Sequence, residues 1–231
     1  MRRHIPNTIT CCNLLSGCIA ATYAFEGVYP IAFAFIIAGA VFDFFDGLSA
    51  RALKVSSPIG KELDSLADVV TFGFAPATMV FSWLRECADM HLDLLPAFAM
   101  PFLAFLLVAF SALRLAKFNV DERQTSSFIG LPTPANALFW GALVIGSHDI
   151  IVSHPYGWIL VVALVLLFSW LLVAEIPMFS LKFKSLAWKA NRIAYTFLLV
   201  SIVLLLLLGL TGLSAVIGWY IILSILTQKR A

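Results

Sequence analysis

Long apolar runs, separated by short polar segments, dominate this sequence. Eight runs approach the roughly 20 residues that a helix needs to cross a bilayer, and the last run is the shortest. They predict an all-α, polytopic transmembrane helix bundle with six core spans and two shorter C-terminal spans. The eight candidates lie near 9–26, 29–50, 62–84, 95–113, 133–147, 156–174, 194–210 and 213–226.

The composition agrees with a membrane protein. Hydrophobic residues make up 61% of the 231 and charged residues 12%, against about half and about a quarter in soluble domains. We expect residues 1–231 to form a single integral membrane domain, so that any functional site is built from the helices. A basic, amphipathic N-terminal segment is expected at 1–10, where Pro6 favours a kinked or surface-lying start near the anionic cytoplasmic leaflet.

The cations are distributed unevenly between the two sides of the expected bundle. With a cytoplasmic N-terminus and eight spans, the outside carries only Arg85 of the fifteen cations, as the positive-inside rule requires. The inside cations are Arg2, Arg3, Arg51, Lys54, Lys61, Arg114, Lys117, Arg123, Lys182, Lys184, Lys189, Arg192, Lys229 and Arg230. Six spans followed by a re-entrant hairpin give the same partition, so the charges predict the orientation and leave the number of spans open.

The second span ends in two aspartates, although a charge inside a span is costly. A spacing of i, i+3, i+4 and i+7 places four residues on one stripe of the helix: Asp43, Asp46, Gly47 and Ala50. At 1.5 Å per residue from Pro30, Asp43 lies about 20 Å along the span. That position is roughly 10 Å below the cytoplasmic boundary of a hydrocarbon core about 30 Å thick.

The third span is expected to begin at Ser57 and Pro58, with the serine as N-cap and the proline at the first helical position. Gly60, Asp64 and Asp68 follow at i, i+4 and i+8 on one stripe. At the same rise, the two aspartates lie about 9 Å and about 15 Å into the helix. The two spans are therefore predicted to bring four carboxylates to a similar depth.

Four carboxylates at one depth repel one another and need compensating charge. Oxygen-rich clusters suit hard dications such as Mg²⁺ and Mn²⁺, which share their coordination with substrate phosphates. Arg51 follows the first pair of aspartates and adds a cation that attracts a diphosphate. The pattern predicts a site for metal and phosphate; a purely structural role and an ion-coupled transporter are the alternatives.

The spacing resembles a known signature. Eight positions within residues 42–68 fit D-x2-D-G-x2-A-R-x8-G-x3-D-x3-D: Asp43, Asp46, Gly47, Ala50, Arg51, Gly60, Asp64 and Asp68. This is the pattern of the CDP-alcohol phosphatidyltransferases, integral membrane enzymes of phospholipid synthesis. Segments 2–20, 114–119 and 128–136 are similar to the bacterial phosphatidylserine synthase branch of that family.

The resemblance implies transfer of the phosphatidyl group of CDP-diacylglycerol to the hydroxyl of L-serine, giving phosphatidylserine and CMP. It implies two Mg²⁺ or Mn²⁺ ions held by Asp43, Asp46, Asp64 and Asp68. Asp68 would also be the general base. An aspartate bound to a dication is a weak base, so either Asp68 binds metal loosely or the metal environment acidifies the serine hydroxyl. Both alternatives stand.

The resemblance also implies substrate contacts. Those expected with CDP-diacylglycerol come from Asn7, Thr10, Gly47, Ala50, Arg51 and Gly60. At the inside end of the fourth span, the diphosphate or the serine carboxylate is expected to bind to Arg114, Lys117 and Asn119. Arginine suits the bidentate binding of such groups. Positive-inside anchoring is the alternative for the two cations.

Other members of the family imply other acceptors. Glycerol 3-phosphate or inositol phosphate carries a phosphate and should demand a more basic acceptor site, and an intramembrane prenyltransferase is a distant alternative. The resemblance further implies a bacterial cytoplasmic (inner) membrane, an active site facing the cytoplasm and a homodimer, with membrane lipids but no nucleic acid as partners. His91, His148 and His154 are expected in outside loops, away from the site.

Overall fold

The computed structural model describes residues 4–55, 57–93, 98–121, 128–179 and 191–227. Within these residues, six helical stretches are long and apolar enough to cross a membrane by length and composition, the sixth of them only when the two C-terminal helices are taken together as Arg192–Leu226, and the apolar helix Gly157–Val173 is shorter. The expected all-α polytopic membrane fold is confirmed. Several cations used to predict the orientation lie outside the described residues: Arg2, Arg3, Arg123, Lys182, Lys184, Lys189, Lys229 and Arg230.

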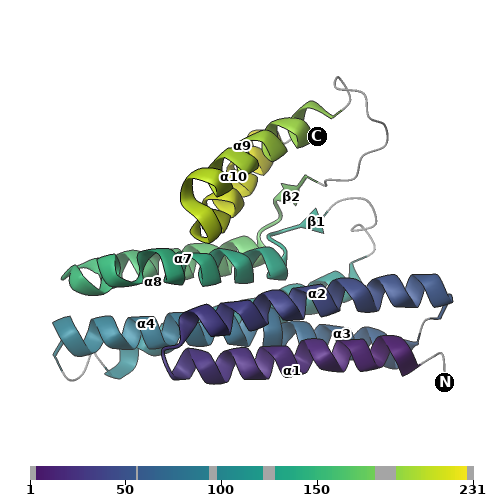
Figure 1. The fold of residues 1–231 in the computed structure, drawn as a ribbon, viewed down its shortest axis with the longest axis horizontal. Coiled ribbons are helices and arrows are strands. Elements are labelled where there is room, and N and C mark those ends of the chain that lie inside the picture. The colour runs from purple at the N-terminus through teal and green to yellow at the C-terminus, as the bar shows by residue number, and fades with distance from the viewer. Residues whose placement is uncertain (1–3, 56, 94–97, 122–127, 180–190, 228–231) are drawn as a thin grey trace.

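Six helical segments lie roughly antiparallel and form the main bundle (Figure 1). They are α1 (Ile5–Phe25), α2 (Tyr29–Leu53), α3 (Pro58–Asp68) continuing through the π-helical η2 (Val69–Phe74) into α4 (Ala75–His91), η3 (Met100–Phe105) with α6 (Leu106–Val120), α7 (Thr133–Ser153) and α8 (Gly157–Val173). The α1 helix packs against α2, α3 and α4. It is therefore central to the half of the bundle that carries the aspartates.

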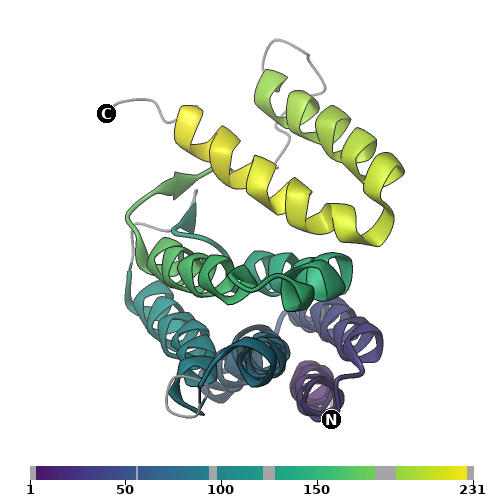
Figure 2. The same cartoon turned by 90° about the vertical axis from the view of Figure 1, so that its left-hand side faces the viewer.

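The C-terminal helices form a hairpin that is inclined to this bundle (Figures 1 and 2). The hairpin consists of α9 (Arg192–Leu208), the short η5 (Gly209–Thr211) and α10 (Gly212–Leu226), which packs on α7 and α9. The turn is made by Gly209, whose φ of 59° is a conformation that suits glycine. At 17 and 15 residues, both helices fall short of a core about 30 Å thick when straight.

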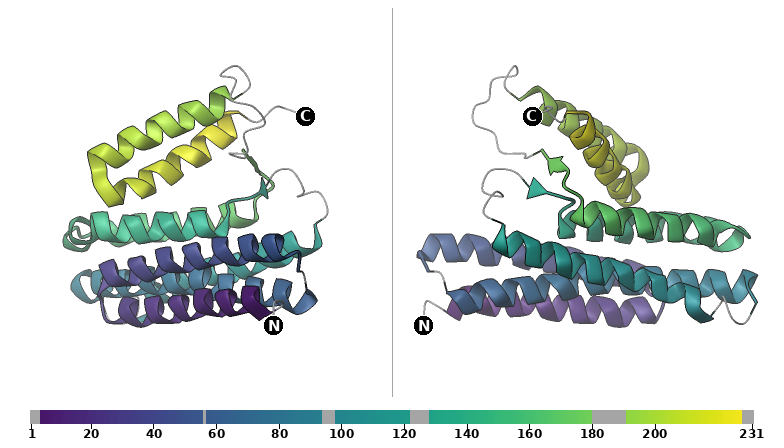
Figure 3. Two further views of the ribbon diagram at one scale, coloured as in Figure 1. Left: turned by 45° about the vertical axis from the view of Figure 1, so that its right-hand side comes forward. Right: turned by 180° about the vertical axis from the view of Figure 1, so that it is seen from behind.

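Alternating helix directions bring one set of helix ends together, as Figure 3 shows. We call this set the polar end: the start of α1, the α2–α3 connection, the end of α6 and the small sheet in which β1 (Phe128–Ile129) pairs antiparallel with β2 (Pro177–Met178). The described cations at this end are Arg51, Lys54, Lys61, Arg114, Lys117 and Arg192, whereas Arg85 lies near the opposite end, in α4. The threading predicted from charge therefore agrees with the fold.

The beginnings of two helices test local predictions. Pro6 lies in the first turn of α1, where its missing N–H removes no helical hydrogen bond. Residues 5–10 therefore belong to the same continuous helix as the rest of α1, and their position at the membrane surface stays a prediction. The N-cap prediction for α3 is confirmed, because Ser57 Oγ accepts a hydrogen bond of 2.9 Å from the Gly60 N–H.

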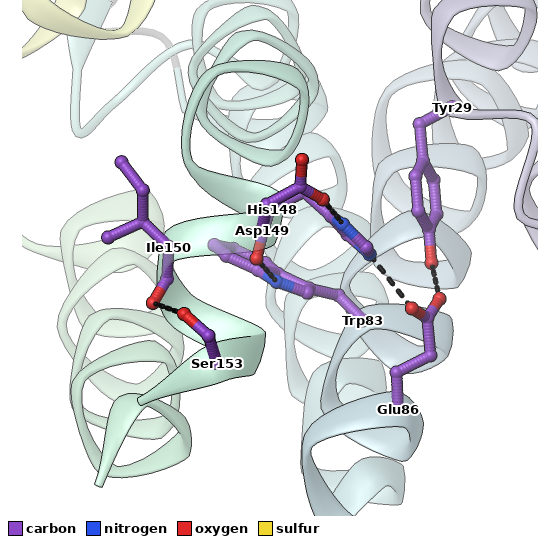
Figure 4. Close-up of polar contacts among 7 residues, drawn as sticks. All are labelled: Tyr29, Trp83, Glu86, His148, Asp149, Ile150 and Ser153. Carbon is purple, nitrogen blue, oxygen red and sulfur yellow. Dashed lines mark hydrogen bonds and ion pairs between the residues drawn. The ribbon is translucent and has the colours of Figure 1, made fainter. Parts of the chain in front are cut away.

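The expected loop positions of two histidines are wrong, because α4 and α7 extend to include them. Figure 4 shows His148 between two carboxylates: its Nε2 lies 2.9 Å from Glu86 Oε2 and its Nδ1 lies 2.9 Å from Asp149 Oδ1. The Tyr29 hydroxyl donates a 2.5 Å hydrogen bond to the other oxygen of Glu86. His91 in α4 also lies 2.7 Å from the carbonyl of Val152. These contacts join α2, α4 and α7 at the end opposite the polar end.

We expect His148→Leu to lower the free energy of unfolding by about 1–2 kcal/mol, because the half-buried Glu86 loses a hydrogen-bond partner. Thermal unfolding in detergent measures the loss, and His154→Leu is the matched control because His154 is exposed. The activity that the resemblance implies should be retained, because the aspartates lie far along the helices from this network. Equal unfolding temperatures for the two variants would contradict a stabilising role for the network.

A second expected result concerns the close packing of α1 against η2. A Cβ atom at Gly17 would lie 2.5 Å from Thr71 Oγ1 and 2.7 Å from its backbone Cα. Because Thr71 is fully buried, we expect Gly17→Ala to destabilise the fold by about 1–3 kcal/mol through overpacking. Gly218→Ala is the control, since its Cβ would meet nothing within 4 Å. Thermal unfolding should separate the two variants, and a similar loss in both would contradict the packing argument.

Candidate active site

The two halves of the aspartate signature converge near the polar end of the bundle. One carboxylate oxygen each from Asp43, Asp64 and Asp68 lies within 4.8 Å of the other two. Asp43 comes from α2 and the other two come from α3, and α1 packs against both helices. Asp68 is only 9% exposed. Three of the four predicted carboxylates therefore form one compact group, in which Asp68 is buried and Asp43 and Asp64 are half-buried.

The fourth carboxylate, Asp46, lies beside this group. It is buried, and its Oδ2 accepts a 2.6 Å hydrogen bond from the Thr10 hydroxyl of α1. Asp46 and Asp64 border the same cavity. Thr10, which was expected to contact substrate, thus has a defined partner on the protein as well as a position in the cavity wall.

A cavity of about 280 Å³ opens beside the aspartates. Its walls come from α1, α2, the α2–α3 connection and α3: Pro6, Asn7, Thr10, Asp46, Gly47, Ala50, Val55, Ser57, Gly60, Lys61 and Asp64. Five of the six residues expected to contact CDP-diacylglycerol are among them. The sixth, Arg51, is exposed, and its guanidinium Nη1 would lie 3.6 Å from a Cβ atom at Gly47. Arg51 therefore extends along the rim of this first cavity.

The glycine of α3 keeps this cavity open. A Cβ atom at Gly60 would lie 3.0 Å from Ser57 Oγ and 3.1 Å from Asn7 Oδ1, which is tight for a carbon atom. A larger residue would push these polar groups apart or fill the space between them. The absence of a side chain at Gly60 therefore preserves both the N-cap of α3 and the cavity wall.

The aspartate cluster fits a divalent metal. Asp64 Oδ1 is shielded from solvent and has no hydrogen-bond partner among the described residues, and a buried acceptor left without a partner is costly. The neighbouring ligand atoms are carboxylate oxygens, which hard cations such as Mg²⁺ and Mn²⁺ prefer. A bound cation would satisfy this oxygen and offset the repulsion among the carboxylates.

Arg114 of α6 points into the protein. It is 7% exposed, its Nη1 donates a 3.5 Å hydrogen bond to Thr133 Oγ1, and its guanidinium lies 5.7 Å from the centre of the Phe118 ring. The Nε of the guanidinium has no hydrogen-bond partner among the described residues. Because an anchor to lipid headgroups must reach the surface, the burial of Arg114 favours a role inside the protein over anchoring.

A second cavity, of about 240 Å³, lies at the ends of α6 and α8. It is lined by two cations, two carboxylates and four apolar residues: Arg114, Lys117, Val120, Asp121, Ile129, Leu172, Val173 and Glu175. Asn119 is outside this lining. Its side-chain Nδ2 donates to Ser65 Oγ at 2.8 Å, and its carbonyl accepts from Lys61 Nζ at 3.0 Å. The structure therefore brings Arg114 and Lys117 together and uses Asn119 to join α6 to α3.

Comparison with known proteins is consistent with this geometry. The family model for CDP-alcohol phosphatidyltransferases matches residues 3–227. The chain belongs to this family. It is therefore a multi-pass membrane transferase, as the resemblance of the signature predicted.

Curated relatives of this phosphatidyltransferase include three named CDP-diacylglycerol–serine O-phosphatidyltransferase. The Bacillus subtilis protein is 36% identical over 135 residues, which are 57% of this chain and 70% of the relative. The Helicobacter pylori protein is 29% identical over 229 residues, covering 96% and 89% of the two chains. The Methanocaldococcus jannaschii protein is 34% identical over 163 residues, covering 71% and 69%.

One residue beside the aspartates of this phosphatidyltransferase was not predicted from its sequence. Asn13 of α1 is fully buried, and its Nδ2 donates a 3.2 Å hydrogen bond to Asp68 Oδ1. The signal was present, because Thr10, Asn13 and Gly17 fall at i, i+3 and i+7 in an otherwise apolar span. A stripe of polar and small residues on a transmembrane helix indicates the face that packs against other helices.

Proposed function

We propose that this phosphatidyltransferase transfers the phosphatidyl group of CDP-diacylglycerol to the hydroxyl of L-serine, giving phosphatidylserine and CMP. The names of the curated relatives support serine as the acceptor. The observation that carries the proposal is the position of the aspartates between two cavities. Asp64 borders the first cavity, and α6, which carries Arg114 of the second cavity, packs against η2, the segment that directly follows Asp68.

The first cavity is the proposed site for the nucleotide end of CDP-diacylglycerol. Asn7 and Thr10 offer polar contacts, while Gly47, Ala50 and Gly60 leave room for the substrate to approach the backbone. The cations nearest to its diphosphate would be Lys61 in the wall and Arg51 at the rim. Asp46 and Asp64 then face the phosphates, which requires a cation between them and the substrate.

We propose that Asp43, Asp46, Asp64 and Asp68 hold two divalent ions, Mg²⁺ or Mn²⁺. When bound, these ions would polarise the phosphoryl oxygens and stabilise the departing CMP. The remaining contribution of the chain is to position the two substrates for in-line attack and to keep the reaction away from bulk water. The burial of Asp46 and Asp68 supports this contribution.

In the proposed reaction, Asp68 acts as the general base. Its Oδ1 accepts a hydrogen bond from Asn13, so Oδ2 is the oxygen proposed to take the proton from the serine hydroxyl. The serine oxygen forms a bond to the lipid-bearing β-phosphorus, and the bond from that phosphorus to the oxygen of CMP breaks. CMP leaves with the electron pair of the broken bond, and Asp68 retains the proton until it passes to solvent.

The second cavity is the proposed serine site. Arg114 and Lys117 suit the carboxylate of a zwitterion, and the carboxylates of Asp121 and Glu175 in the same lining suit its ammonium group. Glycerol 3-phosphate and inositol phosphate carry a dianionic phosphate and no ammonium group. Among the described residues, the two cations of the lining are matched by two carboxylates. This charge balance favours serine over the phosphorylated acceptors.

We also propose a bacterial inner membrane location with the polar end in the cytoplasm, because six of the seven described cations lie at that end. A homodimer is proposed from the family resemblance, and a single domain spanning residues 1–231 is proposed from the composition. Light scattering in detergent tests the dimer. Thiol labelling tests the orientation in the membrane. In a cysteine-free background, Lys54→Cys should react with an impermeant thiol reagent in inverted vesicles and not in right-side-out vesicles.

CMP release tests the proposed activity. Purified protein is given CDP-diacylglycerol and Mn²⁺ or Mg²⁺, with serine, glycerol 3-phosphate or inositol phosphate as the acceptor. We expect release that depends on serine and is abolished by a chelator. Release with only a phosphorylated acceptor would overturn serine while retaining the metal site. A folded protein that releases no CMP with any acceptor would overturn the transferase.

A further inference from the structure

We propose that Asn13 is a positioning residue that fixes the orientation of the Asp68 carboxyl group within the aspartate cluster. This inference rests on the proposed function. Its starting observation is the 3.2 Å hydrogen bond from Asn13 Nδ2 to Asp68 Oδ1, made by a residue that is fully buried in the apolar α1 helix. A buried amide in a membrane span is costly unless its contacts compensate for the cost.

Asn13 is joined to the segment that carries Asp68 through its backbone as well as its side chain. Its own backbone carbonyl accepts a 2.9 Å hydrogen bond from the hydroxyl of Thr71, and Thr71 lies in η2, directly after Asp68 in the chain. The α2 helix passes close to the side-chain amide, since a Cβ atom at Gly39 would lie 3.0 Å from Asn13 Oδ1, and this oxygen has no hydrogen-bond partner among the described residues. The segment that carries Asp68 is therefore joined to Asn13 at two points, one through the side chain and one through the backbone.

Thr71 fixes the position of η2 relative to α1 and α2. A Cβ atom at Gly39 would lie 2.4 Å from Thr71 Cγ2 and one at Gly17 would lie 2.5 Å from Thr71 Oγ1, so the threonine fills the space that both glycines leave. Single π-helical turns occur often at functional sites. Here Thr71 of the π-helical η2 packs between α1 and α2 and so holds the segment that directly follows Asp68 against Asn13.

The same face of α1 contacts two aspartates on two different helices. Thr10 donates to Asp46 of α2, and Asn13, one turn later, donates to Asp68 of α3. Groups that orient metal ligands or catalytic side chains typically change metal affinity or activity by about 10–100-fold when they are removed. With Oδ1 held by Asn13, the rotation of the Asp68 carboxyl group is restricted and Oδ2 keeps a defined direction.

Two substitutions separate positioning from packing. Asn13→Leu fills the space but offers no donor and excludes water, whereas Asn13→Ala leaves room for a water molecule that can donate to Asp68. A positioning role predicts that the leucine variant loses about 10–100-fold in kcat and that the alanine variant loses less, with the KM for CDP-diacylglycerol unchanged in both. A packing role predicts the opposite order. Ser16→Ala is the matched control, since Ser16 is buried on α1 and bonds only to the carbonyl of Cys12 among the described residues.

A second readout does not depend on the acceptor. Mn²⁺ alone is titrated while the unfolding temperature is followed, and we expect Asn13→Leu to need about 10–100-fold more Mn²⁺ than wild type for half-maximal stabilisation. Wild-type behaviour in both readouts, or a larger loss in Asn13→Ala than in Asn13→Leu, would overturn the proposal. If wild type is stabilised by Mn²⁺ but releases no CMP with serine, the proposed function fails and the titration still tests Asn13.

Discussion

Asp68→Asn is expected to reduce serine-dependent CMP release by about 10³-fold or more, the range associated with loss of a general base together with weakened metal binding. The substitution keeps the size of the side chain and its hydrogen-bond acceptor towards Asn13, but it removes the charge and the basic oxygen. Because Asp68 is largely buried within 4.8 Å of Asp43 and Asp64, removing its charge also lowers the repulsion among the carboxylates. The variant should therefore fold at least as well as wild type without metal.

The control for this prediction is Glu62→Gln, which neutralises an exposed carboxylate on the same helix. It should keep wild-type activity and wild-type stabilisation by Mn²⁺. Activity and unfolding temperature are measured for both variants, with and without a chelator. If Asp68→Asn retained more than a tenth of the activity, the general base would have to be another group. If Glu62→Gln lost as much, the effect would reflect the charge of α3 as a whole.

Much of the aspartate site could be predicted because its information is local. The spacing of Asp43 and Asp46 on one helix, and of Asp64 and Asp68 on the next, follows from the 3.6-residue period of the α-helix. The depth of the aspartates follows from the rise per residue, and the start of α3 follows from the cap chemistry of Ser57. The fold class was predictable for a similar reason, since hydrophobic length alone identifies the spans.

The remaining features depend on contacts between distant segments. Asn13 and Asp68 are 55 residues apart, and Glu86 and His148 are 62 apart. No single helix carries the signal for such a pair, because each partner has a plausible local role. The π-helical η2 was not predictable either, since the sequence between Asp68 and Ala75 does not reveal the extra residue in the turn. His148 was predicted in a loop because polar residues near a span end are typical of loops as well as of helix–helix contacts.

The second cavity carries the other large expected effect. Arg114 lines it together with Glu175, 61 residues later in the chain, so its composition was visible only in the fold. We expect Arg114→Met to raise the KM for serine by about 10–100-fold, since a charge-assisted hydrogen bond contributes about 1.5–3 kcal/mol and each 1.4 kcal/mol is a factor of ten. The KM for CDP-diacylglycerol should change little, because the first cavity does not include Arg114.

Arg114→Lys distinguishes charge from geometry, because lysine keeps the positive charge and loses the planar fork that binds a carboxylate at two points. Its serine KM should fall between those of wild type and Arg114→Met. Arg85→Met, near the opposite end of the bundle, is the control and should behave as wild type. A loss confined to kcat would indicate that the arginine acts on the aspartate cluster and not on serine. An increase in the CDP-diacylglycerol KM alone would instead assign Arg114 to the diphosphate, the other role that the sequence predicted for it.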